Sequence, residues 1–187
     1  MRLFIAVPLK EQVKAQVEKI QTRLAKSAAD VKWVNPVNLH LTLKFLGETQ
    51  PDKIGVIDES LNPEIVKFPA FQVRFDVLGA FPGITHPRVV WLAGSQGIQQ
   101  LVSLAGVIEQ QLVSRSFPAE DRPFTAHLTI GRVRSPRGLK KLSHFLDEPK
   151  LAAPLLIDVQ EVHLIQSTLS PRGPDYKTII NWPLTTG

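Results

Sequence analysis

The chain has 187 residues, of which 43% are hydrophobic and 21% are charged, a composition typical of a soluble globular protein with a substantial core. It contains no cysteine, which excludes disulfides, thiolate nucleophiles and cysteine-based zinc sites and is compatible with a reducing cytoplasm. The formal net charge is +5, and the apolar run that begins at Leu3 is broken by Pro8, too soon for a signal peptide or a membrane span.

Hydrophobic periodicity predicts a mixture of strands and helices along the whole chain. Alternation of apolar and polar residues predicts strands over 2–8, 31–34, 39–46, 71–78, 88–93, around 127–130, over 155–167 and over 176–182. Apolar residues three or four apart predict helices over 10–27, 51–62, 98–114 and 139–146. Gly47 is expected to end its strand, and Phe45 and Trp91 are expected in the core. The periodicity therefore indicates an α+β protein.

Two predicted strands carry the same short motif, His40-Leu41-Thr42-Leu43 and His127-Leu128-Thr129-Ile130. Successive side chains of a strand point to opposite faces, so the His and Thr of each motif share one face. A single His-x-Thr is weak evidence, because a lone histidine in a strand is usually structural. Its repetition favours a site in which each strand presents a His and a Thr to one phosphate.

Two histidines suit acid–base chemistry because an unperturbed imidazole pKa near 6.5 lets both protonation states exist near neutrality. A threonine hydroxyl on the same face can donate a hydrogen bond to a phosphate oxygen, where negative charge grows during phosphoryl transfer. Metal binding is the rival interpretation of a histidine pair. The sequence has no HxH or HExxH, and no Asp or Glu lies within three residues of His40 or His127. We therefore expect no metal and no other cofactor.

The segments NLHLTLKFLGE (38–48) and FTAHLTIGRVR (124–134) resemble the paired HxTx motifs of the 2H phosphoesterases. Within that superfamily the chain is most similar to the bacterial and archaeal RNA 2′,3′-cyclic phosphodiesterases, historically called 2′–5′ RNA ligases. The likeness extends to RLFIAVPL (2–9), RVVWLAG (88–94) and QSTLSPRG (166–173), and so covers essentially the whole chain. It implies a single domain over 1–187 with two pseudo-symmetric lobes. Each lobe would be an antiparallel sheet covered by helices and carrying one motif, with the active site in the cleft between them.

The resemblance implies metal-independent hydrolysis of RNA 2′,3′-cyclic phosphodiester ends to 2′-phosphomonoesters, with ATP-independent 2′–5′ ligation as the reverse reaction. It suggests His40 as proton donor and His127 as proton acceptor, although the near-symmetric motifs also permit the opposite assignment. Thr42 and Thr129 would bind the phosphate. The family pattern HxTxxR adds Arg132. Strict alternation places Arg132 on the face opposite His127, but the preceding glycine indicates a bulge that re-aims it.

Several residues are weaker candidates for substrate binding. Arg88, Ser167 and Arg172 lie in segments that resemble the family, and Trp33 or Trp91 offers a ring on which a base can stack. A cluster of cations follows the second motif, and it either attracts RNA or serves only solubility. Its members are Arg132, Arg134, Arg137, Lys140 and Lys141.

Two alternative functions remain open at this stage. One keeps the chemistry but changes the substrate to a small cyclic nucleotide derivative, such as ADP-ribose 1″,2″-cyclic phosphate, or to a 2′–5′ oligonucleotide. The other is a non-catalytic module that binds RNA ends, although phosphate binding alone has no need of two titratable groups. In each case we expect a cytoplasmic monomer without a membrane partner, acting on RNA ends or nucleotides.

Overall fold

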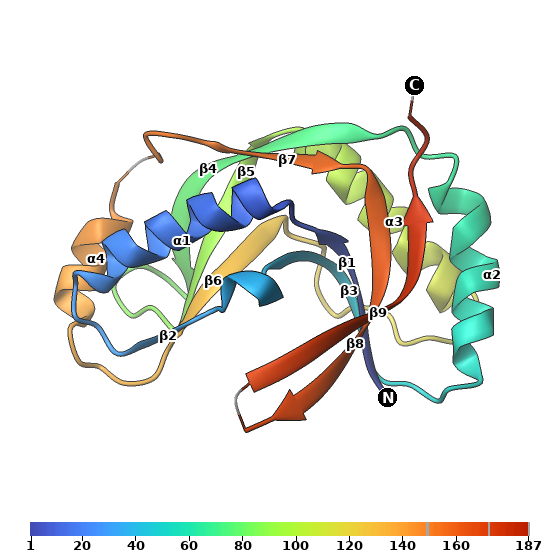
Figure 1. Cartoon of the computed structure of the whole chain (residues 1–187), viewed down its shortest axis with the longest axis horizontal. Helices are drawn as coiled ribbons and strands as arrows, with labels where there is room; N and C mark the ends of the chain where they lie inside the picture. The colour runs from blue at the N-terminus through green and yellow to red at the C-terminus, as the bar shows by residue number, and fades with distance from the viewer. Residues whose placement is uncertain (149, 172, 187) are drawn as a thin grey trace.

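The chain folds into two antiparallel β-sheets flanked by helices, which confirms the α+β class (Figure 1). The structure is a computed structural model that describes residues 1–148, 150–171 and 173–186. The four-stranded sheet has the order β3 (His40–Glu48), β1 (Arg2–Pro8), β8 (Glu161–Ser170) and β9 (Gly173–Pro183). The five-stranded sheet has the order β2 (Val31–Trp33), β6 (His127–Val133), β5 (Val89–Gln96), β4 (Phe71–Phe81) and β7 (Leu155–Val159).

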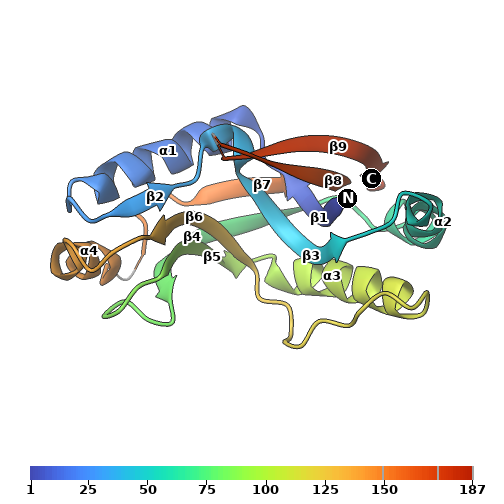
Figure 2. The ribbon, with the colours of Figure 1, turned by 90° about the horizontal axis from the view of Figure 1, so that it is seen from below.

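The helices are α1 (Glu11–Ala25), α2 (Lys53–Ile65), α3 (Ile98–Val113) and α4 (Leu139–Leu146), and a 3₁₀ turn, η1 (Pro36–Asn38), leads into β3. In the view from below, β4, β5 and β6 lie beneath α1, and β3 lies next to α3 (Figure 2). No helix of the described residues is both long enough and apolar enough to cross a lipid bilayer.

The strand predicted over 155–167 is wrong as a single element, because it is two strands in different sheets. β7 pairs with β4 in the five-stranded sheet, whereas β8 pairs with β1 and β9 in the four-stranded sheet. The apolar alternation continues across the break at Gln160, so it gives no sign that the chain changes sheets. Gly47 also does not end its strand. It takes a φ of +65° inside β3, which continues to Glu48.

The two sheets are built from interleaved parts of the chain. β2 lies between β1 and β3 in sequence but joins the five-stranded sheet, and β7 precedes β8 but joins that sheet as well. Each sheet therefore contains strands from both halves of the chain, and neither half supplies a complete sheet.

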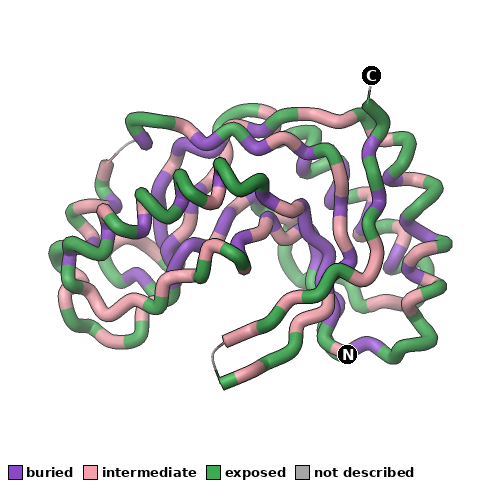
Figure 3. The backbone as a smooth tube through the Cα atoms, in the orientation of Figure 1, coloured by how far each residue is buried: buried purple, intermediate pink, exposed green. Residues whose placement is uncertain are grey.

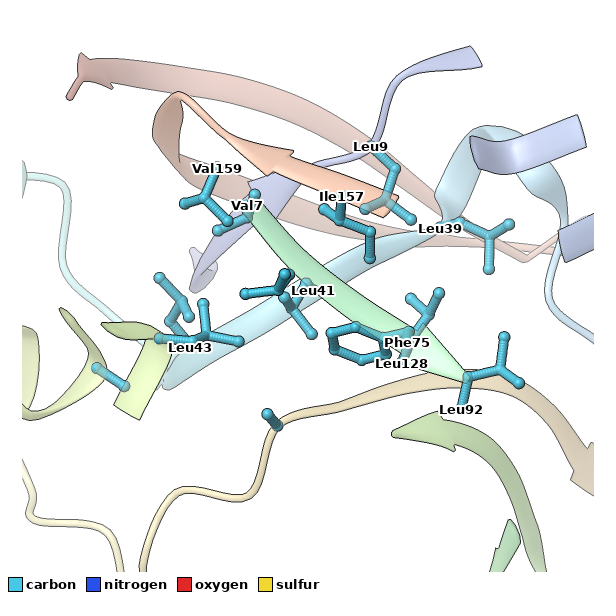
Figure 4. Close-up of a cluster of buried hydrophobic side chains, with 14 of the residues drawn as sticks. Val7, Leu9, Leu39, Leu41, Leu43, Phe75, Leu92, Leu128, Ile157 and Val159 are labelled. Atoms are coloured by element: carbon cyan, nitrogen blue, oxygen red, sulfur yellow. The ribbon is translucent and has the colours of Figure 1, made fainter. Parts of the chain in front are cut away.

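One hydrophobic core joins the two sheets and their helices. Leu41 and Leu43 of β3 lie in the same cluster as Phe75 of β4 and Leu128 of β6 (Figure 4). Buried positions follow the inner sides of the strands, and the outer surfaces of the helices are exposed (Figure 3). Each sheet thus uses one face for the core. The opposite face of the four-stranded sheet carries a separate small cluster formed by Phe4, Ala6 and Ile165.

Candidate active site

The strands that carry the two motifs are neighbours although they belong to different sheets. Backbone Cα atoms of β3 and β6 approach within 8 Å of one another. His40 is the first residue of β3 and His127 is the first residue of β6, so each motif begins its strand. Both histidines are half-buried.

A β-bulge follows the motif in β3. Thr42 pairs with Ala6 of β1 and Lys44 pairs with Ile5, so Leu43 has no partner across the ladder. The extra residue reverses the alternation, and Phe45 pairs with Phe4. Phe45 consequently shares a face with His40 and Thr42. The expectation that Phe45 belongs to the core is wrong, since 65% of its surface is exposed.

An equivalent bulge follows the motif in β6. Thr129 pairs with Trp91 of β5 and Gly131 pairs with Val90, which leaves Ile130 without a partner. Arg132 then pairs with Val89, two residues from Trp91, and so lies on the same face as Thr129. The bulge predicted from the glycine is confirmed. A Cβ on Gly131 would lie 2.7 Å from the ring of Trp33, which packs against the core and explains why this position has no side chain.

The two bulges give both motifs the same layout. In each strand the histidine, the threonine two places on and the residue five places on share one face. The fifth residue is Phe45 in β3 and Arg132 in β6, so the two halves differ in chemistry at an equivalent position. β3 contributes the aromatic ring of Phe45, and β6 contributes the guanidinium of Arg132, whose planar set of N–H donors suits phosphate oxygens.

The same hydrogen bond orients both imidazole rings. Nδ1 of His40 lies 2.7 Å from the carbonyl oxygen of Asn38, and Nδ1 of His127 lies 2.8 Å from the carbonyl oxygen of Thr125. A carbonyl oxygen only accepts, so Nδ1 carries the hydrogen in each ring. Nε2 of each ring is left to take up or give away a proton, which is the arrangement required for acid–base chemistry.

Aromatic rings enclose His40. Its centroid lies 4.6 Å from that of Phe4 and 5.2 Å from that of Tyr176, which meets it edge-on. Burial lowers the pKa of His40, and the hydrogen bond to Asn38 opposes this effect in part. His127 has a similar neighbour in Phe81, whose ring meets it edge-on at 5.5 Å.

Tyr176 connects the two motif faces. It belongs to β9 of the four-stranded sheet and contacts the ring of His40. Burial raises the pKa of Tyr176, and the positive charge of Arg132 acts in the opposite direction. Arg132 belongs to β6 of the five-stranded sheet, yet it lies close enough to act electrostatically on a residue that touches His40. Tyr176 therefore touches the histidine of one motif and lies within electrostatic reach of the arginine that follows the other.

An ion pair made by a buried lysine connects β3 to α3 and to the segment before β6, on the side of β3 away from His40. Lys44 is only 3% exposed, and its Nζ donates to Glu109 of α3 and, at 2.9 Å, to the carbonyl of Pro118. Glu109 also accepts from the backbone N–H of Glu120 at 2.8 Å. Burial acts to raise the pKa of Glu109, but the hydrogen bonds from Lys44 and Glu120 outweigh it and lower the pKa. The pair thus fixes β3 against the segment that leads into β6.

The weaker candidates have different positions. Ser167 of β8 lies opposite Tyr176, on the same face as the small cluster around Phe4. Arg88 is exposed directly before β5, where Val89 rather than Arg88 pairs with Arg132. Arg172 lies outside the described residues. Trp91 was expected in the core, but it is half-buried on the Thr129 face beside Phe81, with ring centroids 5.1 Å apart.

Sequence reasoning missed residues that shape the site on both sides: Phe4, Asn38 and Tyr176 around His40, and Phe81 and Thr125 around His127. Tyr176 is the single tyrosine of the chain, but nothing in its strand pattern indicates that it reaches His40. Asn38 orients His40 through its backbone carbonyl, and its side chain donates to the carbonyl of Pro174 at 2.9 Å. A backbone acceptor leaves no signature in residue type, so this role is visible only in three dimensions.

Among the described residues, no three His, Cys, Asp or Glu side chains gather as they would to hold a metal ion. The side chains that share the motif faces are instead imidazoles, hydroxyls, aromatic rings and a guanidinium. The imidazoles can exchange protons, and the hydroxyls and the guanidinium can donate hydrogen bonds to an anion. Such a set fits a phosphate ester.

The pseudo-symmetry of the site is matched by the comparison with known families. The family described as LigT like phosphoesterase matches residues 7–91 and again 93–176, and each match contains one HxTx motif. The chain belongs to this phosphoesterase family.

Curated relatives agree with this assignment over nearly their whole length. The RNA 2′,3′-cyclic phosphodiesterase of Thermotoga maritima is 37% identical over 180 residues, which cover 96% of this chain and 93% of the relative. The protein of the same name from Archaeoglobus fulgidus is 36% identical over 179 residues, which cover 96% of this chain and 98% of the relative.

Solved structures show the same similarity. E. coli LigT complexed with 3′-AMP has a TM-score of 0.81 at 26% identity, covering 98% of both chains. TT0787 of Thermus thermophilus has a TM-score of 0.80 at 28% identity, covering 98% of this chain and 97% of its own.

Proposed function

We propose that the protein hydrolyses RNA 2′,3′-cyclic phosphodiester ends to 2′-phosphomonoesters by two-histidine acid–base catalysis. The observation that carries the proposal is the matched pair of imidazoles, each anchored through Nδ1 to a backbone carbonyl, with Nε2 bonded to no other described residue. The full-length similarity to relatives named for this reaction supports it.

In the proposed reaction, water attacks phosphorus and the bond from phosphorus to the ribose 3′ oxygen breaks. Nε2 of His127 accepts a proton from the water, and Nε2 of His40 donates a proton to the departing 3′ oxygen. The phosphate stays on the 2′ oxygen. When a 5′-hydroxyl takes the place of water, the same attack joins RNA through a 2′–5′ bond without ATP, because His127 accepts the proton of the hydroxyl and His40 again donates to the departing 3′ oxygen. The two histidines exchange roles when the 2′–5′ bond is cleaved back to the cyclic phosphate. Both motifs have the same local geometry, so the forward assignment follows family resemblance and needs its own test.

Thr42, Thr129 and Arg132 would hold the non-bridging phosphate oxygens. All three share their strand face with a motif histidine, and charge develops on those oxygens in the transition state. Replacement of Arg132 by methionine should lower kcat about 10²- to 10³-fold, the usual effect of removing one such donor. Lysine at this position should restore only part of the rate, because it keeps the charge but loses the planar fork.

The decisive experiment measures turnover of adenosine 2′,3′-cyclic phosphate in EDTA. His40→Ala and His127→Ala should each lose about 10²- to 10⁴-fold in kcat, the usual contribution of a proton-transfer group. His86→Ala is the matched control, because His86 is exposed in a loop and belongs to neither motif. Loss of activity with the chelator, or full activity in His40→Ala, would contradict the proposal. Full RNA binding without turnover in the native protein would instead favour a binding module.

A small nucleotide is the second candidate substrate. The structural relative from E. coli has been solved with 3′-AMP, so its fold accommodates a mononucleotide. Product analysis with matched RNA, 2′–5′ oligonucleotide and ADP-ribose cyclic phosphate substrates separates these activities. The monomeric state and the cytoplasmic location remain predictions, and size-exclusion chromatography and cell fractionation test them.

A further inference from the structure

The stretch that follows the second motif is strongly basic. Residues 122–146 contain six Lys or Arg and no Asp or Glu. Five of the six come after the motif and are exposed, and none forms an ion pair within the described part of the chain. They are Arg132, Arg134, Arg137, Lys140 and Lys141. A cluster of exposed cations without acidic partners is typical of a surface that binds a polyanion such as a nucleic acid.

The strand register places the first of these cations on the motif face. Arg132 pairs with Lys32 of the edge strand β2, so the two side chains share a face. The backbone N–H of Arg134 donates to the carbonyl of Asp30 at 2.8 Å, which continues the pairing by two residues. Arg134 therefore follows Arg132 on the face of His127. Asp30, opposite Arg134, is an acidic residue beside this row and forms no ion pair in the described part of the chain.

Beyond Arg134, the remaining three cations line a hollow at the start of α4. The backbone N–H of Asp30 donates to the carbonyl of Arg137 at 3.2 Å, which brings the 27–30 segment against the start of this helix. The space between them has a volume of about 790 Å³ and is lined by Arg137, Lys140 and Lys141 together with small residues at 27–29. Gly138 has a φ of +74°, and a Cβ there would lie 2.7 Å from the backbone of Ala29. The backbone at Gly138 thus packs closely against Ala29, and the cationic side chains line an open hollow that has no acidic residue in its lining.

We propose that Lys32, Arg134 and the three cations of the α4 hollow bind the backbone phosphates of an RNA chain whose cyclic end occupies the motif site. The inference rests on the proposed function and names its substrate class as an oligonucleotide rather than a free nucleotide. A 2′,3′-cyclic phosphate is the 3′ terminus of its strand, so the rest of the chain leaves the site in the 5′ direction only. The cations continue from Arg132 along the same strand face toward α4, at one end of the molecule (Figure 1).

The test compares two substrates, adenosine 2′,3′-cyclic phosphate and a single-stranded RNA of about 12 nucleotides with the same cyclic end. The variant is Arg137→Gln with Lys140→Gln. The matched control is Lys53→Gln with Arg115→Gln, which removes two exposed cations, one at the start of α2 and one just after α3, that form no ion pair among the described residues. At low salt, KM for the RNA should rise about tenfold in the variant with kcat unchanged. KM for the mononucleotide should not change, and the control should match the native protein on both substrates.

Salt dependence gives a second readout. Loss of two phosphate contacts should reduce the slope of log affinity against log salt for the RNA by about 1.4, or roughly 0.7 per contact. An unchanged KM for the RNA in the variant, or an equal rise in the control, would overturn the inference while leaving the hydrolytic activity in place. If the native protein hydrolyses neither substrate, the proposed function fails, and the salt slope of RNA binding in the two variants then judges the basic surface by itself.

Discussion

Each motif histidine is oriented by the backbone carbonyl two residues before it, so one short segment supplies both the ring and its anchor. This explains how two distant parts of the chain arrive at the same imidazole geometry. The difference between the two sites lies in their surroundings. His40 is enclosed by Phe4 and Tyr176, and its burial lowers its pKa. At neutral pH that environment favours the neutral ring in the free protein, while a bound phosphate with its negative charge favours protonation.

The assignment of acid and base can be decided by changing the leaving group. Sulfur in place of the ribose 3′ oxygen leaves as a thiolate with little need of a proton, because a thiol is far more acidic than an alcohol. With the oxygen substrate His40→Ala should lose about 10²- to 10⁴-fold in kcat, and with the sulfur substrate most of that loss should disappear. His127→Ala should be impaired on both substrates. Rescue of His127→Ala instead of His40→Ala would reverse the assignment.

The lowered pKa of His40 also affects stability. The unfolded chain binds a proton near pH 6.5, whereas the folded protein resists protonation of His40 until a lower pH. Its contribution to folding is therefore complete above about pH 6.5 and is lost as the pH falls from there through the lower pKa of the folded protein. His40→Gln should lose less stability than the native protein between about pH 7.5 and pH 5.5, measured by urea unfolding. His86→Gln, which alters an exposed loop histidine, should follow the native curve. Parallel curves for the native protein and His40→Gln would refute the effect.

At the scale of the elements, the bulge in β6 has a specific support. Gln21 of α1 is 5% exposed, and its Nε2 donates to the carbonyls of Val34 at 2.8 Å and Ile130 at 2.9 Å. Ile130 is the bulged residue, and the bulge turns Arg132 onto the face of His127. The side chain of Gln21 thus stabilises the bulge that orients Arg132, the candidate phosphate-binding residue.

Gln21→Leu should therefore reduce both stability and catalysis. It leaves two buried carbonyls with fewer donors, at a cost of about 1–3 kcal/mol in the free energy of unfolding. If Gln21 acts through Arg132, its replacement should lower kcat in the native background but add little in the Arg132→Met background. Gln16→Leu, at an exposed position of the same helix, is the control. Equal additional losses in both backgrounds would show that Gln21 does not act through Arg132.

At the scale of the whole molecule, the two sheets depend on each other. They share one core, and each contains strands from both halves of the chain. The ion pair of Lys44 and Glu109 also connects β3 of the four-stranded sheet to α3. Two lobes that each carry a motif need not be two folding units. We expect a single cooperative unfolding transition over the chain.

Tryptophan fluorescence can test this expectation. Trp182 is buried in the four-stranded sheet and donates to Asp58 at 2.7 Å, while Trp33 and Trp91 lie in the five-stranded sheet. In a Trp33→Phe, Trp91→Phe variant, the fluorescence of Trp182 reports on one sheet and far-UV circular dichroism reports on both. Coincident urea midpoints are expected. Two separated transitions would mean that the sheets unfold independently.

The sequence by itself determined the features that depend on local pattern. The repeated HxTx placed a His and a Thr on one strand face in each half, and Gly131 indicated the bulge that turns Arg132 to that face. The α+β class and most element positions followed from periodicity. These features are local because alternation determines which side chains share a face as long as the strand is unbroken.

Only the tertiary structure decided the features that depend on contacts between distant segments. Alternation does not say which sheet a strand joins, so the split between β7 and β8 was not visible. A bulge without a glycine is not visible in the sequence either. The sequence therefore predicts Phe45 in the core, although it is exposed on the same face of β3 as His40. Tyr176 reaches His40, and Arg132 acts on Tyr176, only because strands far apart in the sequence pack together. Such contacts depend on how whole sheets and helices pack against one another, and the order of residues within one strand does not reveal that packing.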